Sequence, residues 1–198
     1  MTRAGNPRMS AEARREHLLD AAKQLVAGHG FHAVSIEAVA RTAGITRPIV
    51  YRHFDDLGEL LEALVDRETT RALAQLRSFL PTDLGGDDPR PGLLAALDGY
   101  LHAVREDPVT WRLVLMPPEG APGLLGERIA AGRAAVVAQL AGAVGPAAGS
   151  PDPELTARAL SAVADEAARL TLADPERYTA ERIAAHARWL FNVFYKRI

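Results

Sequence analysis

The chain has 198 residues, of which 48% are hydrophobic, so it can bury a sizeable core and is not expected to be disordered over most of its length. It contains no cysteine, which excludes a disulfide framework, a thiolate metal site and a cysteine nucleophile. The net charge is −2, but residues 1–54 carry eight Lys and Arg against four Asp and Glu, which gives +4 there and −6 in the remainder. Such a distribution allows the positively charged N-terminal part to bind a polyanion while the negatively charged remainder stays away from it.

The sequence favours an all-α protein. Aromatic residues make up only 6% of the chain, and alternating stretches of β-branched residues are missing. No stretch approaches the roughly eighteen apolar residues that a membrane-spanning helix needs, and the polar N-terminus lacks the apolar segment of a signal peptide. We therefore expect a cytoplasmic protein that makes no contact with a membrane.

Residues 1–9 are expected to form a flexible arm ahead of the first helix. Ser10 is placed to cap that helix, which is predicted to run to about Ala27. The glycines that follow end the helix, and Phe31 is expected to enter the core.

A second short helix is expected to begin at Ser35 and to end at Gly44, because glycine readily adopts the backbone conformation found at helix C-termini. Thr46 is predicted to cap a third short helix with its hydroxyl oxygen, and Pro48 is acceptable in the first turn, where its missing N–H is not needed. Two short helices joined by a turn of about three or four residues form a helix-turn-helix.

The third helix is predicted to have a buried side and an exposed side. Val50 and Phe54 are expected to lie in the core. The residues expected to face outward are Arg47, Ile49, Arg52 and His53. This outward face is basic and suited to the major groove of DNA.

The rest of the chain is predicted to be helical as well. A long fourth helix is expected over about 56–80, and the proline- and glycine-rich residues 81–91 are expected to form a linker. Further helices are expected over about 92–106, 108–116, 124–144, 153–173 and 179–196. The residues from Gly145 to Pro153 are rich in Pro, Gly and Ser and are predicted to form a loop.

The last two predicted helices carry more apolar or small-residue surface than one core contact requires. The final helix adds Trp189 and Val193 to its apolar stripe, and the alanine-rich helix before it allows another helix to approach closely. Both helices either join a symmetric bundle of two subunits or close the core of a single chain. The predicted dimer-interface residues are Ala159, Ala162, Val163, Ile183, Ala187, Leu190, Phe191 and Phe194.

Several short motifs stand in a fixed register near the N-terminus. They are Leu18-Leu19-Asp20-Ala21-Ala22, Gly30-Phe31, Val34-Ser35, Val39-Ala40, Ala43-Gly44-Ile45-Thr46, Val50-Tyr51-Arg52-His53-Phe54 and Leu60-Leu61. Through these motifs the chain resembles the TetR (tetracycline repressor) family of transcriptional regulators over about residues 12–65.

The resemblance implies an all-α fold of about nine helices that dimerises through its last two helices. It also implies a DNA-binding head and a divergent ligand-binding body. The domains expected on this basis are a flexible arm at 1–9, a helix-turn-helix DNA-binding domain at 10–55, a connecting helix at 56–80, and a ligand-binding and dimerisation domain at 81–198.

Carried onto this chain, the resemblance implies phosphate contacts by Thr46 and Tyr51 and a contact of His53 near the DNA backbone or a base edge. Arg47 and Ile49 stand nearest the groove floor, where arginine can pair with guanine and isoleucine can contact a thymine methyl. The alternative for Tyr51 and His53 is packing inside the core. The predicted DNA-binding residues are Ser35, Arg41, Thr42, Thr46, Arg47, Pro48, Ile49, Tyr51, Arg52 and His53.

The chain departs from the family pattern at the start of the fourth helix. The family commonly has lysine there, whereas this chain has Leu57, and Asp55 and Asp56 add negative charge beside it. A phosphate contact is therefore expected to be lost, and DNA affinity is expected to depend more on Arg47, Arg52 and the N-terminal arginines.

An effector is expected to bind in the body, because a ligand can shift a regulator only by binding two conformations unequally. The apolar helix that ends at Pro117 can frame the mouth of a pocket, and the alternative for its residues is ordinary core packing. The predicted ligand-binding residues are Trp111, Leu115, Met116 and Glu166.

The sequence indicates no other chemistry. His29 and His32 have no third ligand nearby, and phosphate loops, nucleophile elbows and paired-carboxylate motifs are missing, so we expect no metal, no cofactor and no catalytic residue. The favoured function is a dimeric regulator that represses (pseudo)palindromic DNA operators and is released by an apolar or amphipathic small molecule. One rival interpretation is a ligand- or partner-binding protein whose head has lost operator binding. A second is an enzyme, which would require turnover that survives Arg47→Ala and depends on residues of the body.

Overall fold

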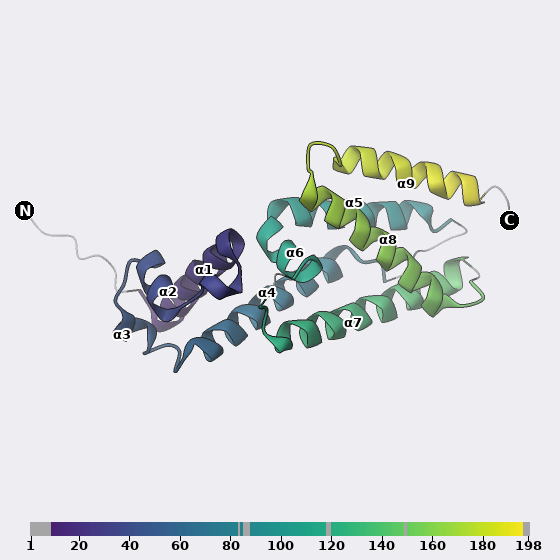
Figure 1. Ribbon diagram of the computed structural model, residues 1–198. Helices are drawn as coiled ribbons and strands as arrows, with labels where there is room; N and C mark the ends of the chain where they lie inside the picture. The colour runs from purple at the N-terminus through teal and green to yellow at the C-terminus, as the bar shows by residue number, and fades with distance from the viewer. Residues whose placement is uncertain (1–8, 83, 85–87, 118–119, 149, 196–198) are drawn as a thin grey trace, which may run out of the picture. The chain divides into compact units, whose positions relative to one another are not determined.

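The structure is a computed structural model that describes residues 9–82, 84, 88–117, 120–148 and 150–195. Within these residues it has nine α-helices, one short 3-10 helix and no strand, which confirms the all-α prediction (Figure 1). The chain forms two compact units. We call Met1–Arg67 with Pro118–Leu124 the head, and Glu68–Pro117 with Leu125–Ile198 the body.

The first helix of the head, α1 (Ala11–His29), extends two residues beyond its predicted end. The Ser10 hydroxyl oxygen accepts a hydrogen bond from the Ala13 N–H (3.1 Å), which confirms the predicted N-cap. Gly30 follows with a φ of +80°, in the left-handed region that favours glycine. A 3-10 helix, η1 (Phe31–Ala33), then places Phe31 in the core, as predicted.

The next two helices, α2 (Ile36–Thr42) and α3 (Arg47–Val50), form the predicted helix-turn-helix. Ser35 caps α2 by accepting a hydrogen bond from the Ala38 N–H (3.1 Å). Gly44 has a φ of +66°, so the turn between the helices uses the backbone freedom that the sequence indicated.

The prediction that the Thr46 hydroxyl caps α3 was wrong. Thr46 is the N-cap residue, but its side chain makes no capping hydrogen bond. Pro48 has no N–H to donate, and the Ile49 N–H donates to the Thr46 carbonyl instead (2.9 Å). The backbone of this short helix therefore satisfies itself and leaves the cap hydroxyl at the surface.

The head has a filled apolar core beneath the helix-turn-helix. Val50 and Phe54 were predicted to face inward, and both are fully buried. The most deeply buried side chains of the head are Leu18, Ala22, Val39, Val50, Phe54, Leu60, Leu64 and Val65. The short helix α3 and the turn after it are thus anchored by two buried side chains, Val50 and Phe54.

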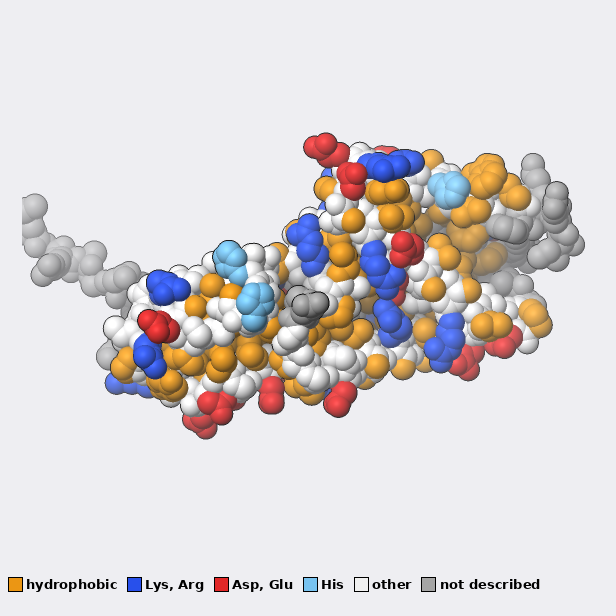
Figure 2. Space-filling model, in the orientation of Figure 1, with side chains coloured by type: hydrophobic (Ala, Val, Ile, Leu, Met, Phe, Trp, Pro, Cys, Tyr) orange, Lys and Arg blue, Asp and Glu red, His pale blue; other side chains and the backbone are white. Residues whose placement is uncertain are grey.

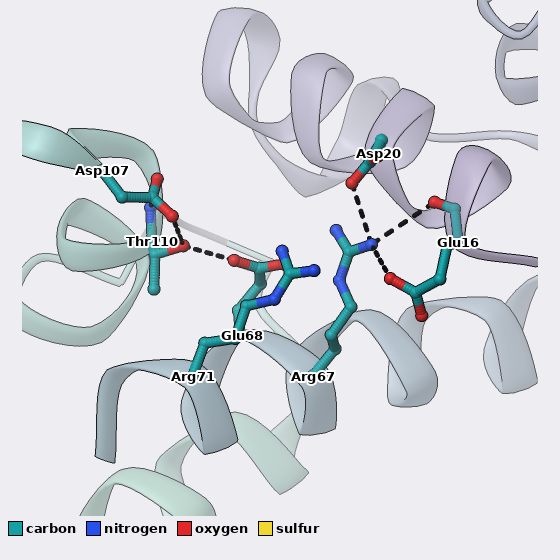
Figure 3. A network of polar contacts seen from close by, with 7 residues as sticks. All are labelled: Glu16, Asp20, Arg67, Glu68, Arg71, Asp107 and Thr110. Atoms are coloured by element: carbon teal, nitrogen blue, oxygen red, sulfur yellow. Dashed lines mark hydrogen bonds and ion pairs between the residues drawn. The ribbon is translucent and has the colours of Figure 1, made fainter. Parts of the chain in front are cut away.

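The fourth helix, α4 (Leu57–Phe79), contributes residues to both units and carries a polar anchor for each of them (Figure 3). In the head, the Arg67 guanidinium lies 3.0 Å from a carboxylate oxygen of Glu16 and 2.9 Å from one of Asp20, both on α1. In the body, the buried Glu68 carboxylate accepts a hydrogen bond from the Thr110 hydroxyl. Successive residues of one helix therefore make the polar contacts of two different units.

The body consists of α4 from Glu68 onward and five further helices. These are α5 (Arg90–Glu106), α6 (Pro108–Leu115), α7 (Gly123–Ala148), α8 (Pro153–Ala173) and α9 (Ala180–Tyr195). Both α8 and α9 pack against α5, and α6 packs against α8 (Figure 1). None of the described helices is long and apolar enough to cross a bilayer.

One helix boundary in the body differs clearly from prediction. The loop expected from Gly145 begins later, because α7 continues to Ala148. Alanine is the strongest helix former, and Pro146 removes a single backbone donor close to the end of the helix. Lys196, which was predicted to end the last helix, lies outside the described residues.

Candidate nucleic-acid interface and ligand cavity

The ten predicted DNA-binding residues lie on α2, α3 and the segments that flank them. Eight of them are exposed, and Ile49 and His53 are half-buried beside the fully buried Val50. Tyr51 is 47% exposed, so core packing does not account for its presence. Figure 2 shows Lys and Arg side chains gathered at the end of the head that carries α2 and α3.

Arg15 on α1 contacts His53 and Phe54, which follow α3. Its guanidinium donates a hydrogen bond to the His53 carbonyl (2.9 Å) and lies 4.2 Å from the centroid of the Phe54 ring. It also lies 3.8 Å from a carboxylate oxygen of Glu59. Arg15 therefore positions the backbone that follows α3, which is a role that nothing in the sequence pattern indicated.

The acidic residues ahead of α4 have a structural role. Asp56 Oδ1 accepts a hydrogen bond from the Glu59 N–H (2.8 Å), and Glu59 Oε2 accepts one from the Asp55 N–H (2.6 Å). Such reciprocal capping stabilises a helix start, and negative charge there is favoured by the helix dipole. Of the two aspartates that add negative charge here, Asp56 caps α4 through its side chain, whereas Asp55 takes part only through its backbone N–H.

The body has a cavity of about 610 Å³ that is partly open to solvent, because its lining residues Leu155 and Val163 are 64% and 63% exposed. All six body helices, α4 to α9, contribute to its wall, and most of the lining side chains are apolar. Trp111, Tyr100 and Phe79 form an aromatic part of that wall, with ring centroids 5.0 Å apart for the first pair and 6.3 Å apart for Tyr100 and Phe79. A cavity of this size and character falls within the range of about 300–1,000 Å³ found for small-molecule sites.

A polar cluster interrupts the apolar wall. The Tyr100 hydroxyl donates to Asp165 Oδ1 (3.0 Å), and Arg133 donates to Asp165 Oδ2 (2.7 Å). Burial, together with the neighbouring Asp165 carboxylate, raises the pKa of Tyr100 well above its ordinary value of 10.0. Tyr100 therefore stays protonated at neutral pH and acts as a donor.

The four predicted ligand-binding residues are divided by the structure. Trp111 and Leu115 line the cavity, and both also belong to the buried core of the body. Their positions are therefore compatible with ligand binding and with core packing. Met116 is 46% exposed and is not among the cavity-lining residues. Glu166 is also outside the lining and lies 3.2 Å from Arg169 at the surface.

The predicted dimer-interface residues are partly accessible in a single chain. Ala159, Ala162 and Val163 on α8 are exposed, with Val163 at 63%. Four of the predicted residues on α9 are half-buried, namely Ile183, Ala187, Leu190 and Phe191. The side chain of Phe194 lies outside what the structure describes. Five of the predicted interface residues, Ala159, Val163, Ala187, Leu190 and Phe191, also line the cavity.

An all-α chain with an exposed helix-turn-helix on a small head and a cavity in a larger helical body has the architecture of a helix-turn-helix transcriptional regulator. The model of the family described as "Bacterial regulatory proteins, tetR family" matches residues 18–64. A helix-turn-helix transcriptional regulator of Mycobacterium tuberculosis is 31% identical over 160 residues, which cover 78% of this chain and 74% of that protein. The chain belongs to the tetR family of bacterial regulatory proteins.

A second relative is the transcriptional activator FasR of Mycolicibacterium smegmatis, which is 31% identical over 112 residues. That match covers 57% of this chain and 49% of FasR, so the chain spans about half the length of this relative. These relatives are named as transcriptional regulators and not as enzymes.

Solved structures agree with the family assignment. A TetR-like regulator from Rhodococcus sp. RHA1 has a TM-score of 0.68 and 26% identity, with 92% of this chain and 96% of that one covered. SmeT in complex with triclosan has a TM-score of 0.69 and 26% identity, with 88% of each chain covered. SmeT is the repressor of the Stenotrophomonas maltophilia multidrug efflux pump SmeDEF.

Proposed function

We propose that the chain is a homodimeric repressor that binds (pseudo)palindromic DNA operators in the cytoplasm and is released when an apolar or amphipathic small molecule enters the body cavity. The observation that carries this proposal is the exposed face of α3 and the residues after it. Arg47, Tyr51 and Arg52 are exposed there, while Val50 between them is fully buried. A basic, polar surface held by a rigid anchor is what reading a DNA groove requires.

Contacts to phosphate and to bases are assigned to different residues. The exposed Thr46 hydroxyl makes no capping hydrogen bond, so it can donate to a phosphate oxygen. Arg47, the first residue of α3, can pair with a guanine edge, which is worth about 1–3 kcal/mol of base discrimination. Asp56 caps α4, so its presence is explained by helix stability and does not require that operator binding has been lost. This favours the proposal over the rival interpretation in which the head no longer binds DNA.

Dimerisation is proposed through α8 and α9. The exposed alanines and Val163 on α8 form a surface on which a second helix can pack closely, and α9 adds the exposed Trp189. A two-fold dimer presents two recognition helices to half-sites separated by about one turn of B-DNA, roughly 34–36 Å. An inverted repeat is therefore the operator form that the proposal requires.

Ligand release is proposed because the body has an apolar cavity and because SmeT, which has a similar fold, is a repressor that binds triclosan. FasR is named as an activator, so the direction of regulation is a separate part of the proposal from DNA binding itself.

The proposal is tested by selecting bound duplexes from a random pool at about 150 mM salt, where surface electrostatics are already well screened. We expect an inverted repeat to be enriched. Replacement Arg47→Ala should then weaken binding to that repeat about tenfold or more, measured by fluorescence anisotropy, because it removes a base contact.

The matched control is Arg105→Ala, which removes an exposed arginine from α5 in the body. It should leave operator affinity unchanged. Enrichment of no sequence, or equal losses for Arg47→Ala and Arg105→Ala, would contradict the proposed operator binding.

A further inference from the structure

A second, smaller pocket of about 190 Å³ adjoins the cavity. It is lined by Arg133 of α7 and by a stripe of α8 that includes Arg158, Asp165 and Arg169. Arg133, Ser161 and Asp165 also line the large cavity, so the two spaces meet at these residues. The apolar cavity therefore adjoins a pocket of a very different character, and the paired side chains of Arg133 and Asp165 stand between them.

The small pocket is lined by three guanidinium groups and one carboxylate. Arg158 is paired with Glu154 (2.8 Å) and Arg169 with Glu166 (3.2 Å), but neither glutamate is among the lining residues of either pocket. Figure 2 shows Lys and Arg side chains along the part of the body where α7 and α8 lie in Figure 1. Among the charged residues that line the pocket, three are arginines and one is an aspartate, so positive charge predominates in the lining.

The single carboxylate in the pocket is already satisfied. Asp165 is 15% exposed, and its two oxygens accept hydrogen bonds from Tyr100 and Arg133. A cationic ligand would share this carboxylate with the two donors and would lie among three arginines, which repel it. An anionic group would instead lie among the guanidinium groups of Arg133, Arg158 and Arg169, which can form charge-assisted hydrogen bonds with it.

We propose that the body cavity takes an amphiphile with an anionic head, whose apolar chain lies in the large cavity and whose head binds among Arg133, Arg158 and Arg169. This inference rests on the proposed function, because it specifies the effector that the cavity accepts. It excludes cationic amphiphiles of the same chain length as good ligands.

The arginines can bind an anion in addition to their present partners or in exchange for them. A guanidinium has five N–H donors in a planar fork, and the bond from Arg133 to Asp165 uses only one of its nitrogens. The pairs of Arg158 and Arg169 lie at the surface, where ion pairs are weak and are readily exchanged. A carboxylate head can therefore join or replace these contacts while the chain gains from burial in the cavity.

The test compares three probes that share a ten-carbon chain, namely decanoate, 1-decanol and decyltrimethylammonium, each below its critical micelle concentration. Isothermal titration calorimetry with the full chain should give decanoate the tightest binding and decyltrimethylammonium the weakest, with the two about tenfold or more apart. Trp111 fluorescence in a Trp189→Phe background should change on binding, because Trp111 lines the cavity and the exposed Trp189 does not.

Variants assign the preference to the small pocket. Arg133→Gln should reduce the ratio of decanoate to decyltrimethylammonium affinity about fivefold or more, because it removes a donor where the two spaces meet. Arg158→Gln provides a second test, since Arg158 is exposed and its loss does not threaten folding. Arg105→Gln changes the charge equally at a site outside both pockets and should leave the ratio unchanged.

The inference is overturned if the three probes bind equally, if the cation binds most tightly, if none binds, or if both pocket variants leave the ratio unchanged. Operator binding is measured separately. If decanoate binds with the expected preference but does not weaken operator binding, ligand release is wrong and the present inference stands. If the operator binds but the head charge has no effect, the present inference fails and operator recognition stands.

Discussion

In the head, the helix-turn-helix rests on a filled core, whereas in the body six helices surround a cavity of about 610 Å³. The side chains of the head that are proposed to bind DNA lie at the surface beside buried anchors such as Val50 and Phe54. The cavity-lining side chains of the body point inward, toward space that other side chains do not fill. A surface that reads DNA needs a rigid support, while a site that responds to a ligand needs room, and the two units differ accordingly.

The largest expected effect follows directly from this contrast. Phe54→Ala should lower the free energy of unfolding by about 3–5 kcal/mol, because it removes a fully buried ring from a closed core. Leu97→Ala should cost only about 1 kcal/mol, because Leu97 is partly buried and already borders the cavity. Urea denaturation followed by circular dichroism measures both. Similar losses for the two variants would mean that the cavity wall is packed as tightly as the core of the head.

An intermediate effect is expected at the polar anchors of α4. Glu68→Ala should destabilise the protein by about 3 kcal/mol, because it removes the buried carboxylate that accepts a hydrogen bond from the Thr110 hydroxyl and leaves a cavity. Glu68→Gln keeps the side-chain volume and an acceptor oxygen and should cost less.

The stability loss at Glu68 is compared with the loss at Arg67, the polar anchor of α4 in the head. Arg67→Ala should cost about 1–2 kcal/mol: the Arg67 side chain is only 10% exposed and loses packing, but its partners Glu16 and Asp20 are 46% and 56% exposed and stay hydrated. Chemical denaturation of the three variants provides the measurement. A larger loss for Arg67→Ala than for Glu68→Ala would reverse the order that burial predicts.

The smallest effects are expected at the start of α4. Asp56→Ala should destabilise the protein by about 1 kcal/mol through loss of the N-cap, while Asp55→Asn should leave stability nearly unchanged because only the Asp55 backbone takes part in the capping. Asp55→Asn should tighten operator binding about twofold to fivefold, because it removes a negative charge near the DNA-binding residues.

Thermal denaturation and fluorescence anisotropy separate these two effects. Unchanged DNA affinity in Asp55→Asn would show that this carboxylate has no electrostatic influence on the operator.

Much of the head could be predicted from sequence because each of its elements has a local signal. Ser10, Ser35 and Gly44 each determine a helix end through their own chemistry, and the structure confirms all three. Thr46 failed as a side-chain cap because the competing bond comes from the backbone of the same short helix. Arg15 could not be identified, since its partner is a backbone carbonyl 38 residues away.

The body was predictable as a set of helices but not as a site. Its helix positions follow from apolar periodicity. The lining of a cavity depends instead on how side chains from several helices pack together and where they leave space. Tyr100, Arg133 and Asp165 come together from α5, α7 and α8, and no local spacing connects them. Met116 was predicted from its place at the end of an apolar helix and Glu166 from its place at the edge of an apolar stripe, and neither is among the residues that line the cavity.

The central claim is that two copies of the head bind one inverted repeat. Light scattering coupled to size-exclusion chromatography, on the protein mixed with its selected duplex at moderate salt, measures the mass of the complex. The account predicts the mass of two chains of 21.3 kDa plus one duplex, and a loss of the complex when one half-site is scrambled. A complex with one chain per duplex, or one that is indifferent to the scrambled half-site, would contradict it.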